Sequence, residues 1–195
     1  GAMSDKEFQT FRIGYNLTSV KNNIYFLTDK HIYSFSGDTT IVFEPIERFT
    51  DIIKVNDMLF VYDVGAGIQM IKNNEINTLI SSENLQQQLI NKEERIFGFF
   101  TTEMGIRFVS TQWRIYSLTG DKIGLIKDLS HLAGDRIYNV NYANNLLLLS
   151  TLGSGTVVLD RDFNFKHMLN NKAGSTSRNH LSSFVDNQNN IWLGT

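Results

Sequence analysis

The sequence predicts an all-β fold, a β-propeller fragment of about four four-stranded antiparallel blades with partial blades at its ends. One observation is a repeated apolar pattern. It begins at residues 23, 57, 105, 145 and 190 and reads NIYFLT, DMLFVY, GIRFVS, NLLLLS and NIWLGT. These starts are 34, 48, 40 and 45 residues apart, and a period of about 42 residues is typical of propeller blades. The other observation is that each repeat holds short runs of β-branched and aromatic residues bounded by Gly, Asn and Asp.

Each unit is expected to run strand, turn, strand, turn, strand, turn, strand. In the third unit these strands are expected at 95–102, 105–110, 114–118 and 122–127. The chain has a single Pro, while Asn is abundant. Because Asn tolerates positive φ and hydrogen-bonds its own backbone, we expect it to fill turn positions for which other chains use Gly or Pro.

The repeat also predicts the domain organisation. Residues 1–4 are expected to be a disordered start that resembles the remnant of an expression tag, and residues 5–195 a single partial propeller. Residues 8–13 are expected to be the outer strand of a preceding blade. The expected blades span residues 14–45, 49–81, 95–128 and 136–169, with a partial blade at 179–195.

The longest spacing contains a segment without strand alternation, residues 82–94 (SENLQQQLINKEE). Leu85, Leu89 and Ile90 recur at i, i+4 and i+5, and Ser81 or Ser82 can cap the first turn. A helical insertion is therefore predicted. A helix that patches the flank of the propeller is favoured over a lid for a ligand. Residues 128–134 are expected to form a single helical turn.

Composition argues against several functions. Charged residues make up 19% of the chain and the formal net charge is −2, without the basic excess typical of nucleic-acid-binding proteins. Cysteine is absent, which excludes disulfides, cysteine–zinc sites and a thiol nucleophile. The four histidines lack metal-binding spacing. The glycines at 65, 67, 153 and 155 are expected to serve turns and not a phosphate-binding loop. We therefore expect no catalytic activity, no cofactor and no metal. No apolar run approaches the roughly 18 residues of a membrane helix, so no membrane contact is expected within this segment.

Residues 179–195 resemble the two-component regulator propeller repeat, in which an Asp-x-x-Gly-Asn turn precedes an apolar-Trp-apolar-Gly-Thr strand. The matching residues are Asp186, Asn190, Trp192, Gly194 and Thr195. Asn189 stands where the family has Gly, and Asn is one of the few other residues that adopt the left-handed conformation readily. The earlier units share only the apolar pattern and the spacing.

The motif residues are expected to have structural roles. Asp186 and Asn190 bracket a tight turn, Trp192 lies between adjacent blades and buries on the order of 200 Å², and Gly194 leaves room for a neighbouring sheet. The positions equivalent to Trp192 in the earlier units are Tyr25, Leu59, Arg107 and Leu147. Arg107 is the exception among them. Either its side chain snorkels or pairs with a carboxylate, or it makes a polar contact with a partner.

The resemblance implies a function. Repeats of this family form the periplasmic sensor region of hybrid two-component regulators, whose histidine kinase lies outside the repeats. The resemblance therefore implies a non-catalytic sensor domain that binds a ligand such as an oligosaccharide. The implied partners are the remaining blades of the same protein. The open blade faces and sheet edges of a partial propeller also predict pairing with a second copy in a homodimer. The alternative is a propeller scaffold that binds other proteins and no small molecule.

Propeller geometry gathers certain loops on one face around a central channel, and those loops hold the candidate ligand-binding residues. The candidates are Asp63, Gln112, Trp113, Arg136, Arg178 and His180. Trp113 is either a stacking platform for a sugar or an ordinary packing residue. Arg136 and Arg178 either meet a ligand carboxylate or sulfate together, or are solvated or paired with Asp135 or Asp128.

Overall fold

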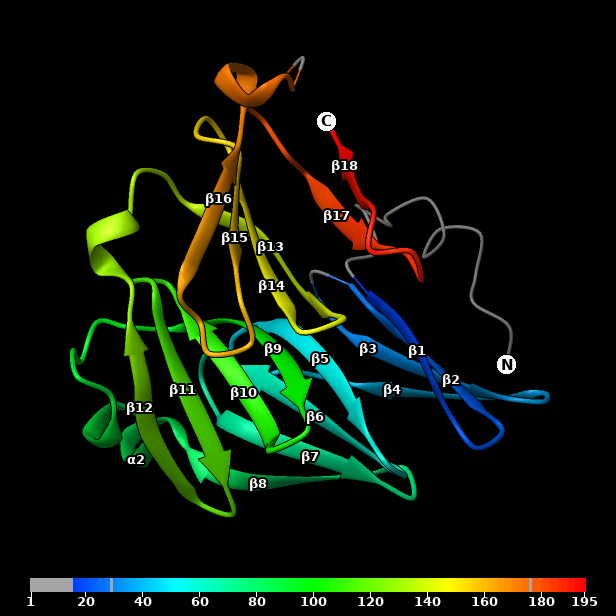
Figure 1. Ribbon diagram of the computed structural model, residues 1–195. Helices are drawn as coiled ribbons and strands as arrows, with labels where there is room; N and C mark the ends of the chain where they lie inside the picture. Colours follow the sequence, from blue (N-terminus) through cyan, green and yellow to red (C-terminus); the bar gives the residue numbers. More distant parts are fainter. Residues whose placement is uncertain (1–15, 29, 176) are drawn as a thin grey trace. The chain divides into compact units, whose positions relative to one another are not determined.

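The computed structural model describes residues 16–28, 30–175 and 177–195. Within them the chain is all-β. Four four-stranded antiparallel sheets, each with its strands in sequence order, are followed by a two-stranded hairpin (Figure 1). We number the sheets blades 1 to 4. The predicted fold class is confirmed, whereas the strand expected at 8–13, the start of the first blade at residue 14 and the segment 1–4 lie outside the described residues.

The described residues divide into two compact units, 16–96 with Gly120–Ile123 and Phe97–Thr119 with 124–195. The first unit contains blades 1 and 2 and the helix α2 (Ser82–Gln88). The strands of blade 1 are β1 (Asn16–Val20), β2 (Asn23–Leu27), β3 (Ile32–Ser36) and β4 (Thr39–Phe43). The strands of blade 2 are β5 (Phe49–Val55), β6 (Met58–Asp63), β7 (Gly67–Lys72) and β8 (Glu75–Ser81).

The second unit contains most of blade 3, all of blade 4 and the hairpin. The strands of blade 3 are β9 (Ile96–Thr102), β10 (Gly105–Ser110), β11 (Arg114–Thr119) and β12 (Lys122–Asp128). Those of blade 4 are β13 (Ile137–Ala143), β14 (Leu146–Thr151), β15 (Thr156–Leu159) and β16 (Phe165–Leu169), and the hairpin is β17 (Ser182–Val185) and β18 (Ile191–Gly194). Short 3-10 turns, η1 (Ser130–Leu132) and η2 (Asn171–Ala173), follow β12 and β16. The helical turn expected within 128–134 is thus confirmed.

The core of the first unit lies between the sheets of blades 1 and 2. Tyr25 and Leu27 of β2 pack in one cluster with Leu59 and Val61 of β6, and none of the four is more than 4% exposed. Burying an apolar side chain of this size contributes roughly 1.5–3 kcal/mol. The two sheets are therefore held together mainly by their apolar faces.

The second unit repeats this arrangement. Val109 of blade 3 packs in one cluster with Leu147 and Leu149 of blade 4, and all three are fully buried. The opposite face of β14 carries Leu148, which packs with Val185 of β17. Since β14 buries both of its faces, it needs a packing partner on each side.

Asparagine fills the tight turns as expected. Six of the nine described non-glycine residues with positive φ are Asn, namely Asn56, Asn73, Asn74, Asn144, Asn145 and Asn189. The pairs 73–74 and 144–145 each fill both central positions of a two-residue hairpin turn. Type I′ geometry requires positive φ at both of these positions, which Asn tolerates.

The inserted helix is shorter than predicted, because it ends at Gln88 and does not run to residue 94. Ser81 caps it as expected, with its Oγ accepting from the Asn84 N–H at 3.3 Å. Leu89 is already extended, and it buries its side chain while Ile90 remains 60% exposed. Gln88 accepts a hydrogen bond from the Ile123 N–H at 2.9 Å and so covers backbone of β12, the outermost strand of its sheet.

The gapless alignment of the repeats is wrong in register. The first strand residues after the hairpin turns are Asn23, Met58, Gly105, Leu146 and Ile191. Tyr25 and Arg107 are therefore third in their strands, whereas Leu59, Leu147 and Trp192 are second. A shift of one residue moves a side chain to the opposite face of a strand. Packing shows which positions are out of register. Tyr25 and Arg107 share the faces of Leu27 and Val109, which pack on the following blade, and Trp192 likewise projects away from the preceding blade 4. Leu59 and Leu147 face the preceding blade and are therefore the residues that are not equivalent to Trp192.

Arg107 also differs from its predicted structural role. It is 6% exposed, so its side chain does not snorkel to solvent. Its Nη1 donates to the Ile106 carbonyl at 2.9 Å, while its Nε has no hydrogen-bond partner, and no described carboxylate pairs with it. Burial lowers the pKa of this guanidinium. The alternative, a polar contact with a partner, stays a prediction.

The closing motif forms the predicted turn. Oδ1 of Asp186 accepts from the Gln188 and Asn190 N–H groups at 2.9 Å each, and Oδ2 accepts from the Asn190 amide at 3.0 Å. Asn189 has φ +64°, the left-handed conformation expected of it. The segment from Asp160 to Asn164 forms the same loop, with its carboxylate accepting from the Asn164 N–H at 2.8 Å.

Trp192 is 61% exposed, because β17 and β18 turn Val185 and Ile191 toward blade 4 and Trp192 projects from the other face. Its indole N–H donates to Asp186 Oδ2 at 2.9 Å. Its place between adjacent blades stays a prediction. A Cβ at Gly194 would overlap the Ser182 hydroxyl, so this glycine makes room within its own hairpin. The close approach of a neighbouring sheet at this position stays a prediction.

Two glycines with similar backbone angles test the packing of blade 4. Gly155 has φ +99° and a Cβ there would overlap the Leu169 carbonyl, whereas Gly174 has φ +91° and open space around it. Both alanine variants incur the cost of a left-handed residue, about 1–2 kcal/mol. Gly155→Ala must also displace backbone, which adds about 1–3 kcal/mol. Urea unfolding is therefore expected to show a larger loss for Gly155→Ala than for Gly174→Ala, and equal losses would contradict this packing.

Candidate functional site

The turns between second and third strands are built alike in all four blades. At or just after the end of the second strand lies a polar residue that is at most 4% exposed: Thr28, Asp63, Ser110 or Thr151. Its side chain hydrogen-bonds the backbone of the following turn. The Thr151 hydroxyl, for example, donates to the Gly155 carbonyl at 2.8 Å and accepts from the Ser154 N–H at 3.2 Å. Such side-chain bonds fix a turn from within, and these turns carry or adjoin the residues predicted to bind ligand.

Asp63 is one of these buried caps. Its carboxylate accepts from the backbone N–H groups of Ile46, Glu47, Arg48 and Gly65 at 2.6 to 3.3 Å. The side chain is fully buried. The geometry therefore favours a structural role, in which Asp63 ties the segment before β5 to the turn between β6 and β7.

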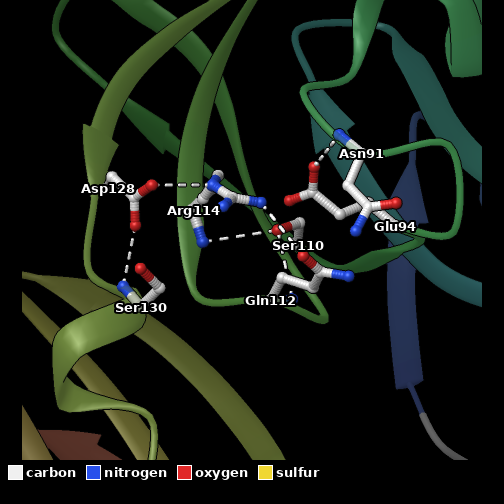
Figure 2. Close-up of polar contacts among 7 residues, drawn as sticks. All are labelled: Asn91, Glu94, Ser110, Gln112, Arg114, Asp128 and Ser130. Atoms are coloured by element: carbon white, nitrogen blue, oxygen red, sulfur yellow. Dashed lines mark hydrogen bonds and ion pairs between the residues drawn. The ribbon is translucent and has the colours of Figure 1, made fainter.

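A polar cluster in blade 3 includes the predicted residue Gln112 (Figure 2). Arg114 donates from Nη1 to Gln112 Oε1 at 3.1 Å and from Nε to Asp128 Oδ2 at 2.8 Å. The Ser130 N–H donates to Asp128 Oδ1 at 2.8 Å. Hydrogen bonds from Ser130 and then from Arg114 lower the pKa of Asp128 to about 2. The same view contains a separate contact of the first unit, from the Asn91 N–H to Glu94 Oε2 at 3.0 Å.

Trp113 is a packing residue in the structure. It is 3% exposed and belongs to the core of the second unit, and its indole N–H donates to the Asp135 carbonyl at 3.3 Å. A buried ring cannot present a face to a sugar. Of the two alternatives that the sequence left open, the geometry favours packing.

His180 is also buried, at the junction of blade 4 and the hairpin. Its Nδ1 lies 2.8 Å from Thr156 Oγ1 and its Nε2 lies 3.0 Å from Ser175 Oγ. The Thr156 hydroxyl is in turn 2.9 Å from Ser150 Oγ. Hydroxyls can donate or accept, so either neutral tautomer of the imidazole is satisfied. The network holds the segment that follows η2 against blade 4.

Arg136 and Arg178 are both exposed, and one strand separates their backbones. The Leu152 N–H donates to the Arg136 carbonyl at 3.5 Å and the Gly153 N–H to the Arg178 carbonyl at 3.3 Å. Neighbouring strands lie about 4.8 Å apart, so the two backbones are about 10 Å apart. Among the predicted site residues described, these two have exposed side chains and backbones that lie on either side of one strand.

Ion pairs of these arginines with Asp135 or Asp128, one of the alternatives left open by the sequence, are not present among the described residues. Asp135 accepts from the Ser154 hydroxyl, and Asp128 pairs with Arg114. The two guanidiniums are therefore available to an anion. The same part of the chain shows no group of three or more His, Cys, Asp or Glu side chains that could hold a metal ion.

One exposed aromatic in this region was missed by the sequence analysis. Tyr138, next but one to Arg136, is 46% exposed because the pairing of β13 with β14 shifts at this residue. The signal in the sequence is a break in alternation, since the core-facing Ile137 and Val140 are three residues apart. A regular strand would place them on opposite faces.

No protein-family model and no curated protein matches the chain, but solved structures do. The extracellular domain of a putative one-component system from B. thetaiotaomicron aligns over 92% of this chain and 25% of its own, with 13% identity and a TM-score of 0.68. The extracellular domain of a putative hybrid two-component system from the same bacterium aligns over 92% and 27%, with 15% identity and a TM-score of 0.67. The chain is built of β-propeller blades. It spans about a quarter of the length of these two domains, and at such identities the likeness is one of fold.

A further propeller likeness is to YCF48 bound to D1 peptide. It covers 94% of this chain and 60% of that one, with 12% identity and a TM-score of 0.61. None of the described helices is long and apolar enough to cross a bilayer.

The difference in solvent exposure between the two tryptophans can be tested by fluorescence. Trp113 is 3% and Trp192 is 61% exposed. Trp192→Phe is expected to shift the fluorescence emission to the blue and to reduce quenching by acrylamide, because only the buried indole remains. Trp113→Phe is expected to do the opposite. Equal quenching of the two single-tryptophan variants would show that Trp113 is accessible to a ligand after all.

The carboxylate of Asp128 provides a second test. Arg114→Gln removes a donor and a positive charge, so the pKa of Asp128 is expected to rise from about 2 toward the usual 3.8. Because the folded-state pKa is lowered, the stabilisation by this group is present above pH 3.8 and is lost as the pH falls toward 2. NMR titration of the carboxyl carbon measures the shift. The exposed Arg161→Gln is the control and is expected to leave the Asp128 titration unchanged.

Proposed function

We propose that this chain is a non-catalytic, ligand-binding part of an extracytoplasmic sensor domain, as in hybrid two-component regulators. The observation that carries the proposal is the fold likeness to extracellular domains of one-component and hybrid two-component systems over 92% of the chain. On this proposal the segment functions in the periplasm, and its output is a histidine kinase outside these residues. The remaining blades of the same protein and a second copy are its macromolecular partners.

The proposed ligand is an oligosaccharide, bound at the turn edge of the second unit. We define this edge as the turns around Arg136, Leu152–Gly153 and Arg178. Two features of this edge support binding. Buried side chains hydrogen-bond its backbone and fix the turns. The guanidiniums of Arg136 and Arg178 are exposed and have no acid partner among the described residues. Arginine in this setting can offer paired donors to a ligand oxygen without first breaking an ion pair.

The alternative function is a scaffold for another protein. It is favoured by the exposed face of the terminal hairpin, where Phe184 and Trp192 are directly opposed and 60% and 61% exposed. Exposed aromatic pairs of this kind are typical of protein contacts. Among the structures with a similar fold, YCF48 was solved with a bound peptide.

Calorimetric titration of the chain with a panel of neutral and acidic tetrasaccharides tests the first proposal. At least one member is expected to bind, and the double variant Arg136→Gln/Arg178→Gln is expected to weaken that binding about tenfold or more, the effect of losing roughly 1.4 kcal/mol. Arg161→Gln, an exposed arginine elsewhere in blade 4, is the matched control. Absence of binding across the panel would contradict ligand sensing and leave the scaffold function.

A further inference from the structure

The turn edge of the second unit contains an aromatic side chain that only the strand pairing exposes. In β13, Ile137 is opposite Thr151 and Asn139 is opposite Ser150 of β14, so Tyr138 has no partner. This is a β-bulge, in which one extra residue is inserted and a side chain is aimed in a new direction. Ile137 is 2% exposed, whereas the next residue, Tyr138, is 46% exposed.

The register also determines which side chains share a face with this tyrosine. Arg136 lies opposite Leu152, and Leu152 bridges to Asn179 on its other side. Directly opposed residues project from the same face of an antiparallel pair, so these three side chains lie together. Since Ile137 and Thr151 point into the protein, the exposed Tyr138 projects on the face of Arg136. The resulting surface contains an aromatic ring, a guanidinium, an amide and the 39% exposed Leu152.

Blade 2 contains a bulge at the same place without an aromatic residue. The equivalent shift occurs between Phe49 and Asp51, and the extra residue there is Thr50. The bulge is therefore a feature of how these blades begin, and it does not require an aromatic residue. Blade 4 uses the same irregularity to expose a ring beside Arg136.

We propose that Tyr138 is a stacking residue of this edge and that, with Arg136 and Arg178, it takes an acidic saccharide bearing a carboxylate or sulfate. This deepens the proposed function and rests on it. A tyrosine ring supplies a large rigid contact area with two χ angles, which suits the apolar C–H face of a sugar ring. A guanidinium on the same face suits an anionic group on that sugar. The backbone of Arg178 lies about 10 Å from that of Arg136 across residues 152–153, so the long side chain of Arg178 can serve a second anionic group on the same or the neighbouring sugar.

The test compares two tetrasaccharides that differ only at their carboxyl groups, tetragalacturonate and its uncharged, fully methyl-esterified form. Calorimetry on the wild-type chain is expected to show about tenfold or tighter binding of the acid over the ester, equal to roughly 1.4 kcal/mol. Tyr138→Ala is expected to weaken binding of both forms about tenfold, and Tyr138→Phe is expected to bind both nearly as well as the wild type. Arg136→Gln is expected to reduce the preference for the acid.

The controls separate this inference from the proposed function. Phe165→Ala removes another half-exposed aromatic of blade 4, and it is expected to leave affinity unchanged. If a saccharide binds but Tyr138→Ala has no more effect than Phe165→Ala, or if acid and ester bind equally, the inference is overturned while ligand sensing stands. If neither form binds and the wider panel of tetrasaccharides also fails, both are overturned.

Discussion

The structure depends on a buried polar residue at the end of each blade's second strand. Thr28, Asp63, Ser110 and Thr151 are almost fully buried, and their side chains hydrogen-bond the turn that follows. A turn has more backbone donors and acceptors than it can pair internally, and leaving one buried and unpaired costs about 1–3 kcal/mol. These side chains remove that cost. They also hold each of these turns in one conformation, so the neighbouring residues are attached to rigid backbone.

The same constraint explains why two of the six predicted ligand-binding residues, Asp63 and His180, are hydrogen-bonded within the fold. A polar residue at a blade turn has two possible uses, to bind a ligand or to satisfy polar groups of the fold itself. Asp63 accepts from four backbone N–H groups, and each ring nitrogen of His180 lies within hydrogen-bond distance of a hydroxyl, so both are used in the second way. Arg136 and Arg178 are not, and they are therefore the residues on which the proposed site depends. Their ligand-binding role and that of Gln112 stay predictions.

The repeat predicted the blades but not the faces of their strands. An alignment that is wrong by one residue keeps the repeat period and the apolar pattern, because both faces of β6, β10 and β14 are largely buried and apolar. It does not keep the direction of the side chains, since a shift of one residue exchanges the two faces of a strand. Leu59 and Leu147 were aligned with Trp192 for this reason, although they face the preceding blade. The place of Trp192 between blades stays a prediction, because its face of the hairpin is the one turned away from blade 4.

By itself the sequence determined the all-β class, the four blades, the Asn-rich turns and the Asp186–Asn190 loop. These follow from local rules: alternation, β-branched runs and the tolerance of Asn for positive φ. Only the tertiary structure decided that Trp113 is core, that the guanidiniums of Arg136 and Arg178 are without a described acid partner, and that a bulge exposes Tyr138. Burial and pairing register are properties of segments that meet across the fold, and no single segment carries them in its own residues.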